Sequence, residues 1–277
     1  MKKAAIIAAA LALGVTAPAL ADHHMAAPGM SAVLAADARA DDSARDQYRN
    51  PAETLSFFDV KPGMTVVDYM PSGGWYTRIL VPYLGEGGTY IGMNPAIPAD
   101  ATGFMARMAN YGDTLPGQVT EWLGGAPGAK VVGVNVGDEM PESMAGSVDR
   151  VLIFREIHNM HRFGWLQPSL ASIRTMLKDD GMVGVVQHRA PHSASADYTD
   201  GSKGYMREAD VIALFQANGF ELYARSEVNA NPADPANWPN GVWTLPPRLG
   251  GATDETRPAL VEIGESDRMT LLFRKRP

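Results

Sequence analysis

The sequence contains no cysteine, which excludes disulfide bonds as a source of stability. It has no run of basic residues and its formal net charge is −7, so neither nucleic acid nor an anionic membrane surface is expected as a partner. No internal repeat and no linker-like composition interrupt the middle of the chain. A chain of 277 residues with these absences must rely on a hydrophobic core, and one elaborated domain is expected.

Only the beginning of the chain carries a long apolar run. Lys2 and Lys3 precede this run, which is too short for a lasting membrane span, and Ala-Leu-Ala at 19–21 is a small-x-small cleavage site. These features predict a secretory signal peptide over residues 1–21 that is cleaved after Ala21. The product is therefore expected to be periplasmic or secreted.

The next residues predict a flexible leader, because residues 22–44 are small and polar and show no sustained period. The main domain is then expected over residues 45–277. Cleavage would leave Asp22 first, followed by two histidines, and such an amino terminus could hold Cu(II) through its amine, two amides and the imidazole of His24. Short leaders that contain histidine are also often simply solvated.

From Asn50 onward, short apolar runs alternate with helical patterns. Such alternation implies right-handed crossovers and a parallel sheet that is covered on both faces. We therefore predict a doubly wound α/β fold with a mostly parallel, seven-stranded sheet. The strand candidates are the VVDYM run from Val66 and residues 89–93, 130–136, 149–154, 182–188, 220–226 and 267–275.

A long segment rich in proline, asparagine and glycine, residues 227–266, joins the last two strand candidates where a simple hairpin would suffice. Loops of this length in a compact domain are usually lids or binding loops, so we predict an inserted functional loop here. Its Trp238 and Trp243 could wall a substrate site or could anchor the loop to the body of the protein.

Four segments carry a family resemblance when they are taken in order. VVDYMPSGGWYT, at residues 66–77, has the outline of a strand, a cofactor loop and a helix. The other three are GDEMPESMAGSVDRVLIF, MLKDDGMVGVV and ANGFELYARSE. Over roughly residues 50–275 the chain resembles class I S-adenosylmethionine-dependent methyltransferases. It is most similar to a group of exported predicted methyltransferases that share NPAETLxFFxVKPGMTVVxxxPxGGWYT.

The resemblance implies a cofactor site at the first of these segments and beyond it. Asp68 would order the loop and contact the amino-acid end of S-adenosylmethionine, and the loop itself would bind through Ser72, Gly73 and Gly74. Asn94 stands where an acid usually binds the ribose hydroxyls. The adenine-contacting acid corresponds to Asp138. Glycines in such a loop let the backbone approach the ligand closely, beside a helix amino terminus.

Two departures from the family pattern affect the loop. Met70 and Ser72 occupy positions that usually hold glycine, and Ser72 is comfortable only if its backbone avoids positive φ. One interpretation is that Gly73 and Gly74 suffice for binding; another is an inherited fold that has lost or changed its cofactor. A nucleophile elbow at Ser72 is a third possibility, but Met70 would hinder its tight turn.

Four histidines follow the expected fourth and fifth strands: His158, His161, His188 and His192. The carboxyl ends of neighbouring parallel strands meet at one edge of a sheet, so we expect these side chains to converge there with Glu156, Arg155 and Arg189. They could act as a general base, ligate a metal, or hydrogen-bond the surrounding loops.

Together these patterns predict an exported methyltransferase-like protein that uses S-adenosylmethionine and a small-molecule acceptor. The expected catalytic residues are His158, His188 and Glu156, and no metal ligand is assigned. The alternative is a protein on the same fold that has lost its cofactor, or that binds a metal through the histidines. The sequence does not identify the acceptor or the oligomeric state.

Overall fold

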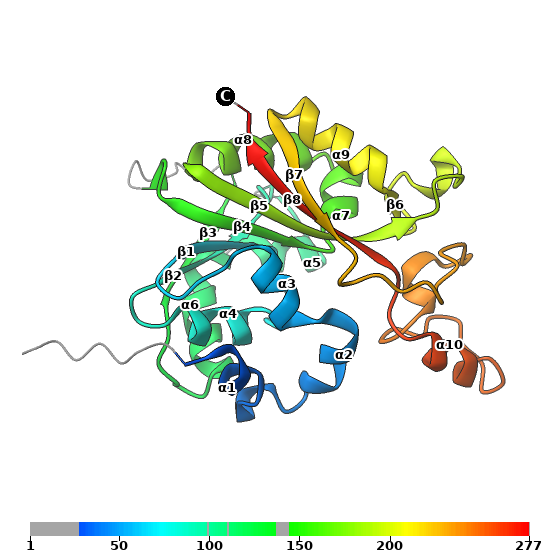
Figure 1. Cartoon of the computed structure of the whole chain (residues 1–277), viewed down its shortest axis with the longest axis horizontal. Helices are drawn as coiled ribbons and strands as arrows, with labels where there is room; N and C mark the ends of the chain where they lie inside the picture. Colours follow the sequence, from blue (N-terminus) through cyan, green and yellow to red (C-terminus); the bar gives the residue numbers. More distant parts are fainter. Residues whose placement is uncertain (1–27, 99, 110, 137–143, 277) are drawn as a thin grey trace, which may run out of the picture.

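One mixed sheet organises the protein (Figure 1). The structure is a computed structural model that describes residues 28–98, 100–109, 111–136 and 144–276. The strands run in the order β3-β2-β1-β4-β5-β8-β7, and the short β6 pairs with β5 beside this path. Their bounds are β1 Thr65–Tyr69, β2 Thr89–Asn94, β3 Lys130–Asn135, β4 Val148–Phe154, β5 Leu177–Ala190, β6 Met206–Arg207, β7 Phe220–Ser226 and β8 Arg268–Lys275.

The sheet is parallel except at β8, which is antiparallel to both β5 and β7. The parallel strands are continuous apolar runs, such as Val66 and Val67 in β1, because both faces of the sheet are covered. The prediction of a doubly wound, mostly parallel sheet is confirmed. Because β1, β2, β4 and β5 are parallel, their carboxyl ends lie at the same edge of the sheet.

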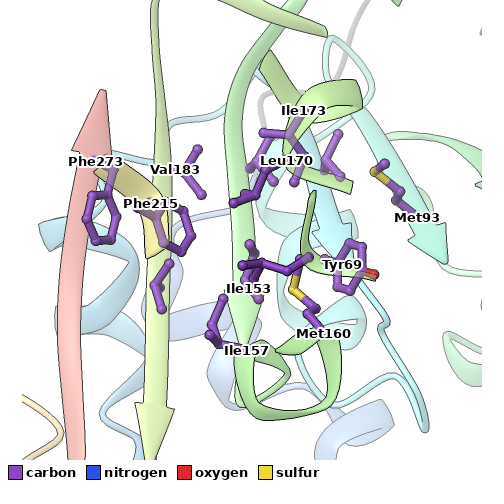
Figure 2. Close-up of a cluster of buried hydrophobic side chains, with 14 of the residues drawn as sticks. Tyr69, Met93, Ile153, Ile157, Met160, Leu170, Ile173, Val183, Phe215 and Phe273 are labelled. Carbon is purple, nitrogen blue, oxygen red and sulfur yellow. The ribbon is translucent and has the colours of Figure 1, made fainter. Parts of the chain in front are cut away.

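Helices cover both faces of the sheet (Figure 1). One hydrophobic cluster packs side chains of α7, α8 and α9 against the strands, as Figure 2 shows for Met160, Leu170 and Phe215. A second cluster uses α3, α4 and α6 on the other face. The helices are α1 Met30–Leu34, α2 Asp46–Arg49, α3 Pro51–Phe57, α4 Thr77–Leu84, α5 Gly103–Ala109, α6 Tyr111–Trp122, α7 Ile157–Arg162, α8 Leu166–Met176, α9 Glu208–Ala217 and α10 Arg257–Ile263, with 3-10 turns η1 Asp37–Arg39, η2 Ser43–Arg45, η4 Ala196–Tyr198 and η5 Gly241–Thr244.

The prediction of a flexible leader is wrong for residues 28–44. These residues form α1, η1 and η2, and the Val33 side chain is buried in the second hydrophobic cluster. Arg39 is fully buried and donates to the Asp46 carboxylate over 2.6 Å. The segment is ordered by long-range partners, which its own small and polar composition does not indicate. Residues 1–27, with the expected signal peptide and copper site, lie outside the described residues.

The segment between β7 and β8 contains η5 and α10 and otherwise consists of turns. Asp234 fixes its first part, because this carboxylate accepts hydrogen bonds from the Tyr205 hydroxyl and the Trp238 indole over 2.8 and 2.9 Å. Trp238 therefore anchors the segment. Within the described parts of the chain, no helix combines the length and apolar character needed to cross a membrane.

Candidate functional site

The loop between β1 and α4 keeps the backbone of a glycine-rich loop although two of its residues are not glycine. Met70 and Ser72 both have φ of 53°, and Gly74 has φ of 75°. Ser72 therefore does adopt the positive φ that disfavours a residue with a Cβ. The Met70 amide donates to the Met93 carbonyl over 2.8 Å and the Ser72 hydroxyl donates to the Met70 carbonyl over 3.2 Å. These two hydrogen bonds and the burial of the Met70 side chain stabilise the left-handed conformation of Met70 and Ser72.

The two glycines of this loop have different surroundings. A Cβ on Gly74 would lie 2.4 Å from the Trp122 ring, which packs from the end of α6, so only glycine fits there. A Cβ on Gly73 would meet nothing within 4 Å. Gly73 and Ser72 are exposed. The backbone at Ser72 and Gly73 is therefore the part of the loop that a ligand can approach.

Residues from the amino-terminal segment pack over the loop. The Arg78 guanidinium donates to both carboxylate oxygens of Asp42, over 2.6 and 2.9 Å, and the Trp75 indole donates to the Asp42 carbonyl over 3.3 Å. The guanidinium carbons of Arg39 and Arg49 lie 5.1 and 4.5 Å from the centre of the Trp75 ring. The loop and α4 are thus held between the sheet and the amino-terminal segment.

Asp68, at the end of β1, is buried and only 2% exposed. Its carboxylate accepts a hydrogen bond of 2.9 Å from the Tyr90 hydroxyl, which lies 2.7 Å from the Thr77 hydroxyl at the start of α4. Burial raises the pKa of Asp68 to about 7, and the hydrogen bond from Tyr90 opposes that rise. Asp68 therefore links β1, β2 and α4 beneath the loop.

The other two predicted cofactor residues are Asn94 and Asp138. Asn94 is buried at the end of β2, and its carbonyl accepts from the Val136 amide over 2.8 Å. Strand pairing places Asn94 one residue beyond the pair formed by Tyr69 and Met93, next to the loop. Asp138 lies outside the described residues.

Glu156, His158 and His188 come together at the ends of β4 and β5. The two imidazole ring centres are 5.8 Å apart. His158 Nδ1 lies 3.4 Å from the Gln187 amide nitrogen, and His188 Nδ1 lies 2.6 Å from the Ser266 hydroxyl. Glu156, at the start of α7, accepts a hydrogen bond of 2.7 Å from the Asn159 side chain.

Burial sets the protonation of these three groups. It lowers the pKa of His158 to about 4, and it lowers that of His188 well below its usual value with help from neighbouring positive charges. Both imidazoles are therefore neutral at pH 7. Burial raises the pKa of Glu156 to about 7, opposed by the hydrogen bond from Asn159. Glu156 can therefore exchange a proton near neutral pH.

A cavity of about 380 Å³ connects the exposed part of the loop with these groups. Ser72 lines one side, and Glu156, His158 and His188 line another. The segment between β7 and β8 contributes Trp243, which lies 6.2 Å from the His158 ring. The remaining lining residues are Arg45, Arg155, Asn159, Arg162, Val242, Leu245, Pro246, Pro247, Arg248, Glu265 and Ser266.

The expected convergence of four histidines is wrong for two of them. His161 is exposed and lines a different groove near α9, because it lies one turn of α7 away from the cavity. His192 is exposed beyond the end of β5 and does not line the cavity. Among the residues that the structure describes, no group of three histidine or acidic side chains is arranged to hold a metal ion. The described structure therefore does not favour the metal-binding alternative.

Three functional candidates on the cavity wall have no counterpart in the sequence analysis: Arg45, Glu265 and Ser266. Arg45 Nε donates to the Glu265 carboxylate over 2.6 Å across 220 residues of chain. No local motif signals such a pair. The one signal in the sequence is that Glu265 and Ser266 directly precede the last strand. A residue before a parallel strand lies at the edge opposite to the site, but β8 is antiparallel, so its first residue lies at the edge where β4 and β5 end.

No model of a protein family matches this sequence, and no curated protein sequence matches it either. Solved structures do match its fold. A cyclopropane-fatty-acyl-phospholipid synthase-like protein from Lactobacillus casei superposes with a TM-score of 0.50 at 15% identity, over 90% of this chain and 98% of that chain. A chain of the complex that contains the Haloferax volcanii Trm112 methyltransferase activator gives 0.50 at 15% identity, over 89% and 97%.

A SAM-dependent methyltransferase from Aquifex aeolicus is also similar, with a TM-score of 0.49 and 18% identity over 73% of this chain and 93% of that chain. At such identities a likeness shows the fold alone. The chain thus has the Rossmann-like fold found in S-adenosylmethionine-dependent methyltransferases. This fold is compatible with many reactions, so the residues of the site determine which reaction the protein can catalyse.

Proposed function

We propose that this protein is an S-adenosylmethionine-dependent methyltransferase that acts on a small molecule. One observation carries the proposal: the β1–α4 loop has left-handed residues at positions 70, 72 and 74, and opens at Ser72 onto the cavity lined by Glu156 and the two buried histidines. A cofactor loop and a set of proton acceptors therefore share one cavity. The fold likeness is consistent with the proposal.

The residues present fit the methionine end of the cofactor. The open space beside Gly73 admits a ligand close to the backbone, and the buried Asp68 network keeps the loop in place. Ser72 and Gly73 would hold the amino-acid part, Gly74 would keep the loop in place against Trp122, and Asn94 would bind the ribose. When bound, S-adenosylmethionine supplies an electrophilic methyl group on a sulfonium. Asp138 remains the proposed adenine contact.

Glu156 is the best-matched proton acceptor, because its pKa of about 7 lies near the working pH. Its carboxylate would take the proton that the acceptor atom loses as that atom gains the methyl group. His158 and His188 would accept hydrogen bonds from the acceptor as neutral imidazoles, and so orient it. Trp243, with His158, would wall the acceptor side of the cavity.

Calorimetric titration with S-adenosylmethionine and S-adenosylhomocysteine tests the proposal. We expect heat of binding with the unmodified protein. Asn94→Ala should lower the affinity by up to about tenfold, because a ribose hydrogen-bond partner is lost. Asn237→Ala, at an exposed asparagine outside the cavity, should bind as the unmodified protein does. The absence of heat and of any thermal shift at millimolar ligand would exclude the methyltransferase proposal.

We also propose that the protein is exported, on the basis of the signal-peptide pattern in residues 1–21. Expression in a bacterium with two membranes, followed by mass spectrometry of the periplasmic extract, tests this. A mature chain that begins at Asp22 is expected. Recovery of only the full-length chain in the cytoplasmic fraction contradicts export without affecting the methyltransferase proposal.

A further inference from the structure

Three arginines from distant parts of the chain surround one buried carboxylate at the base of the cavity. Glu265, 5% exposed, accepts from Arg45 Nε over 2.6 Å, from Arg49 Nε over 3.3 Å and from Arg268 Nη1 over 3.2 Å. Arg49 and Arg268 are each only 2% exposed. A single carboxylate cannot neutralise three guanidinium groups, two of which are buried and the third, that of Arg45, partly exposed.

Arg155 adds a fourth positive charge. It lies at the turn from β4 to α7 with φ of 64°, a conformation that L-residues seldom adopt, and its side chain lines the cavity. Arg155 thus lines the same cavity as Arg45 and Glu265. Burial lowers the pKa of Arg49 and of Arg268, and the charge of Arg155 lowers both further, whereas the charge of Glu265 raises both. Even with Glu156 fully ionised, four cations face two carboxylates.

Several of the guanidinium nitrogens also lack acceptors. Arg45 Nη2, Arg49 Nη1 and Arg49 Nη2 are buried, and among the described residues they have no hydrogen-bond partner. Trp75 offers the Arg49 guanidinium one aromatic face, which is weaker than a hydrogen bond to an anion. Buried donors and excess positive charge of this kind are stabilised by a bound anion. The protein as a whole is acidic, so the cluster does not reflect its average composition.

We propose that the acceptor molecule is an anion, and that its carboxylate or phosphate group binds in the cavity against Arg45 and Arg155. This inference rests on the proposed methyltransferase function. Arg49 and Arg268, which both donate to Glu265, add positive potential. The Ser266 hydroxyl on the cavity wall can donate to an anionic oxygen. Arg162 and Arg248, both exposed on the lining, attract the anion from solvent.

The test uses the full mature protein saturated with S-adenosylhomocysteine, so that the carboxylate of the cofactor is already in place. Inorganic phosphate and benzoate are then titrated separately at constant ionic strength, and calorimetry measures binding. We expect one or both to bind, with affinity reduced about tenfold or more in Arg155→Gln. Arg257→Gln, an exposed position on α10, should leave the affinity unchanged.

A second variant checks the sign of the electrostatic effect. Glu265→Gln removes the carboxylate that competes with the ligand for the arginines, so phosphate should raise the melting temperature of this variant more than that of the unmodified protein. An equal or smaller rise contradicts the proposal. This measurement remains informative where the variant is less stable, because the added anion is then expected to restore stability.

The remaining outcomes separate the two proposals. If neither anion binds the saturated protein, or if S-adenosylhomocysteine displaces the anions, the cluster serves no acceptor and the inference is overturned. Displacement would assign the arginines to the carboxylate of the cofactor itself. In a further outcome, S-adenosylhomocysteine does not bind, phosphate binds the unmodified protein, and Arg155→Gln abolishes the phosphate binding. The anion site is then supported and the methyltransferase proposal fails.

Discussion

At the residue scale, the β1–α4 loop shows how tertiary contacts fix a backbone that its side chains do not favour. A left-handed conformation costs a residue with a Cβ about 1–2 kcal/mol. Met70 and Ser72 both adopt it. The Met70 side chain regains free energy through burial in the hydrophobic core, whereas the Ser72 side chain is exposed. The strain at Ser72 is therefore the less compensated of the two.

Ser72→Gly should stabilise the protein by about 0.5–1 kcal/mol, because glycine adopts positive φ without steric cost and loses only part of this gain to chain entropy. Urea denaturation measures the free energy of unfolding. Ser72→Ala keeps the strain and removes the hydrogen bond to the Met70 carbonyl, so it should be neutral or slightly destabilising. Equal stabilities of the glycine and alanine variants would contradict this account of the loop.

Gly73 and Gly74 provide a matched pair for the same loop. Gly74→Ala should destabilise the protein by about 2 kcal/mol or more, because the new methyl group would meet the Trp122 ring and the backbone has positive φ. Gly73→Ala should leave the free energy of unfolding within about 1 kcal/mol of the unmodified value. It should instead weaken S-adenosylhomocysteine binding, because the methyl group occupies the space beside the loop. Thermal unfolding and calorimetry on both variants separate the two effects.

Asp68 gives a prediction for pH. Its pKa is raised to about 7 by burial, above the value of about 3.9 in an unfolded chain, so the folded state holds a proton that the unfolded state releases. This contribution to stability is fully present below about pH 4 and is lost as the pH rises through about 7.

Asp68→Asn should remove that pH dependence. Between about pH 5 and about pH 8, the stability of the unmodified protein relative to the variant should fall by about 1 kcal/mol or more, as measured by urea denaturation. The side-chain amide of the variant can still accept from the Tyr90 hydroxyl, so the comparison isolates the proton. Asp41→Asn, at an exposed position, controls for the loss of one acidic group. A constant difference across this range would contradict the assignment.

At the element scale, an ion pair joins the amino-terminal segment to α4. Asp42 and Arg78 are largely buried, with side chains 12% and 15% exposed, and they pair through two hydrogen bonds. A double-mutant cycle with Asp42→Ala and Arg78→Ala should give a coupling free energy of about 1.5–3 kcal/mol. The exposed pair Glu221–Arg274 should give less than about 1 kcal/mol in the same measurement. Similar values for the two pairs would show that the segment is not held in this way.

The central strands β1, β2 and β4 were predictable from the sequence because they are short apolar runs that are buried on both faces. The strands β3 and β7, at the two ends of the strand order, are only partly buried, and β3 was predictable as an apolar run alone. The candidates at 89–93 and 220–226 match β2 and β7 to within one residue, and 182–188 lies inside the longer β5. The folded amino-terminal segment was not predictable in the same way. Its order depends on Arg78 and Trp75, which lie in a different part of the chain, and no pattern within residues 28–44 encodes that contact.

The candidate site was only partly predictable for a similar reason. His158 and His188 follow directly from the rule that parallel strands end at one edge, and the structure brings them together. The Glu265 cluster combines residues that are more than 200 positions apart and lie at or beside α2 and β8, outside any local motif. The positive φ of Ser72 runs against the intrinsic preference of serine, because hydrogen bonding to β2 and burial of the adjacent residues decide the conformation of the loop.

At the scale of the whole molecule, the acidic surface and the basic cavity have opposite signs, and this contrast should appear as a salt effect. The proposed anion site is partly enclosed, with exposed Arg162 and Arg248 at its lining. Association of phosphate with the S-adenosylhomocysteine-saturated protein should therefore slow as sodium chloride is raised, because screening removes the attraction from solvent. Stopped-flow mixing would measure the rate. Arg248→Gln should show a smaller salt dependence, and an unchanged dependence would argue against a role for this residue.

The strand order has a consequence for the time course of folding during synthesis. β8 comes after every other strand along the chain, yet it lies between β5 and β7 and is buried from Arg268 to Phe273. A ribosome that has made residues up to Ser226 has supplied seven of the described strands, but β7 still lacks β8, with which it pairs, and β5 still has one open edge. The sheet can close only after the inserted segment and β8 have emerged, so the partly made chain stays open until then.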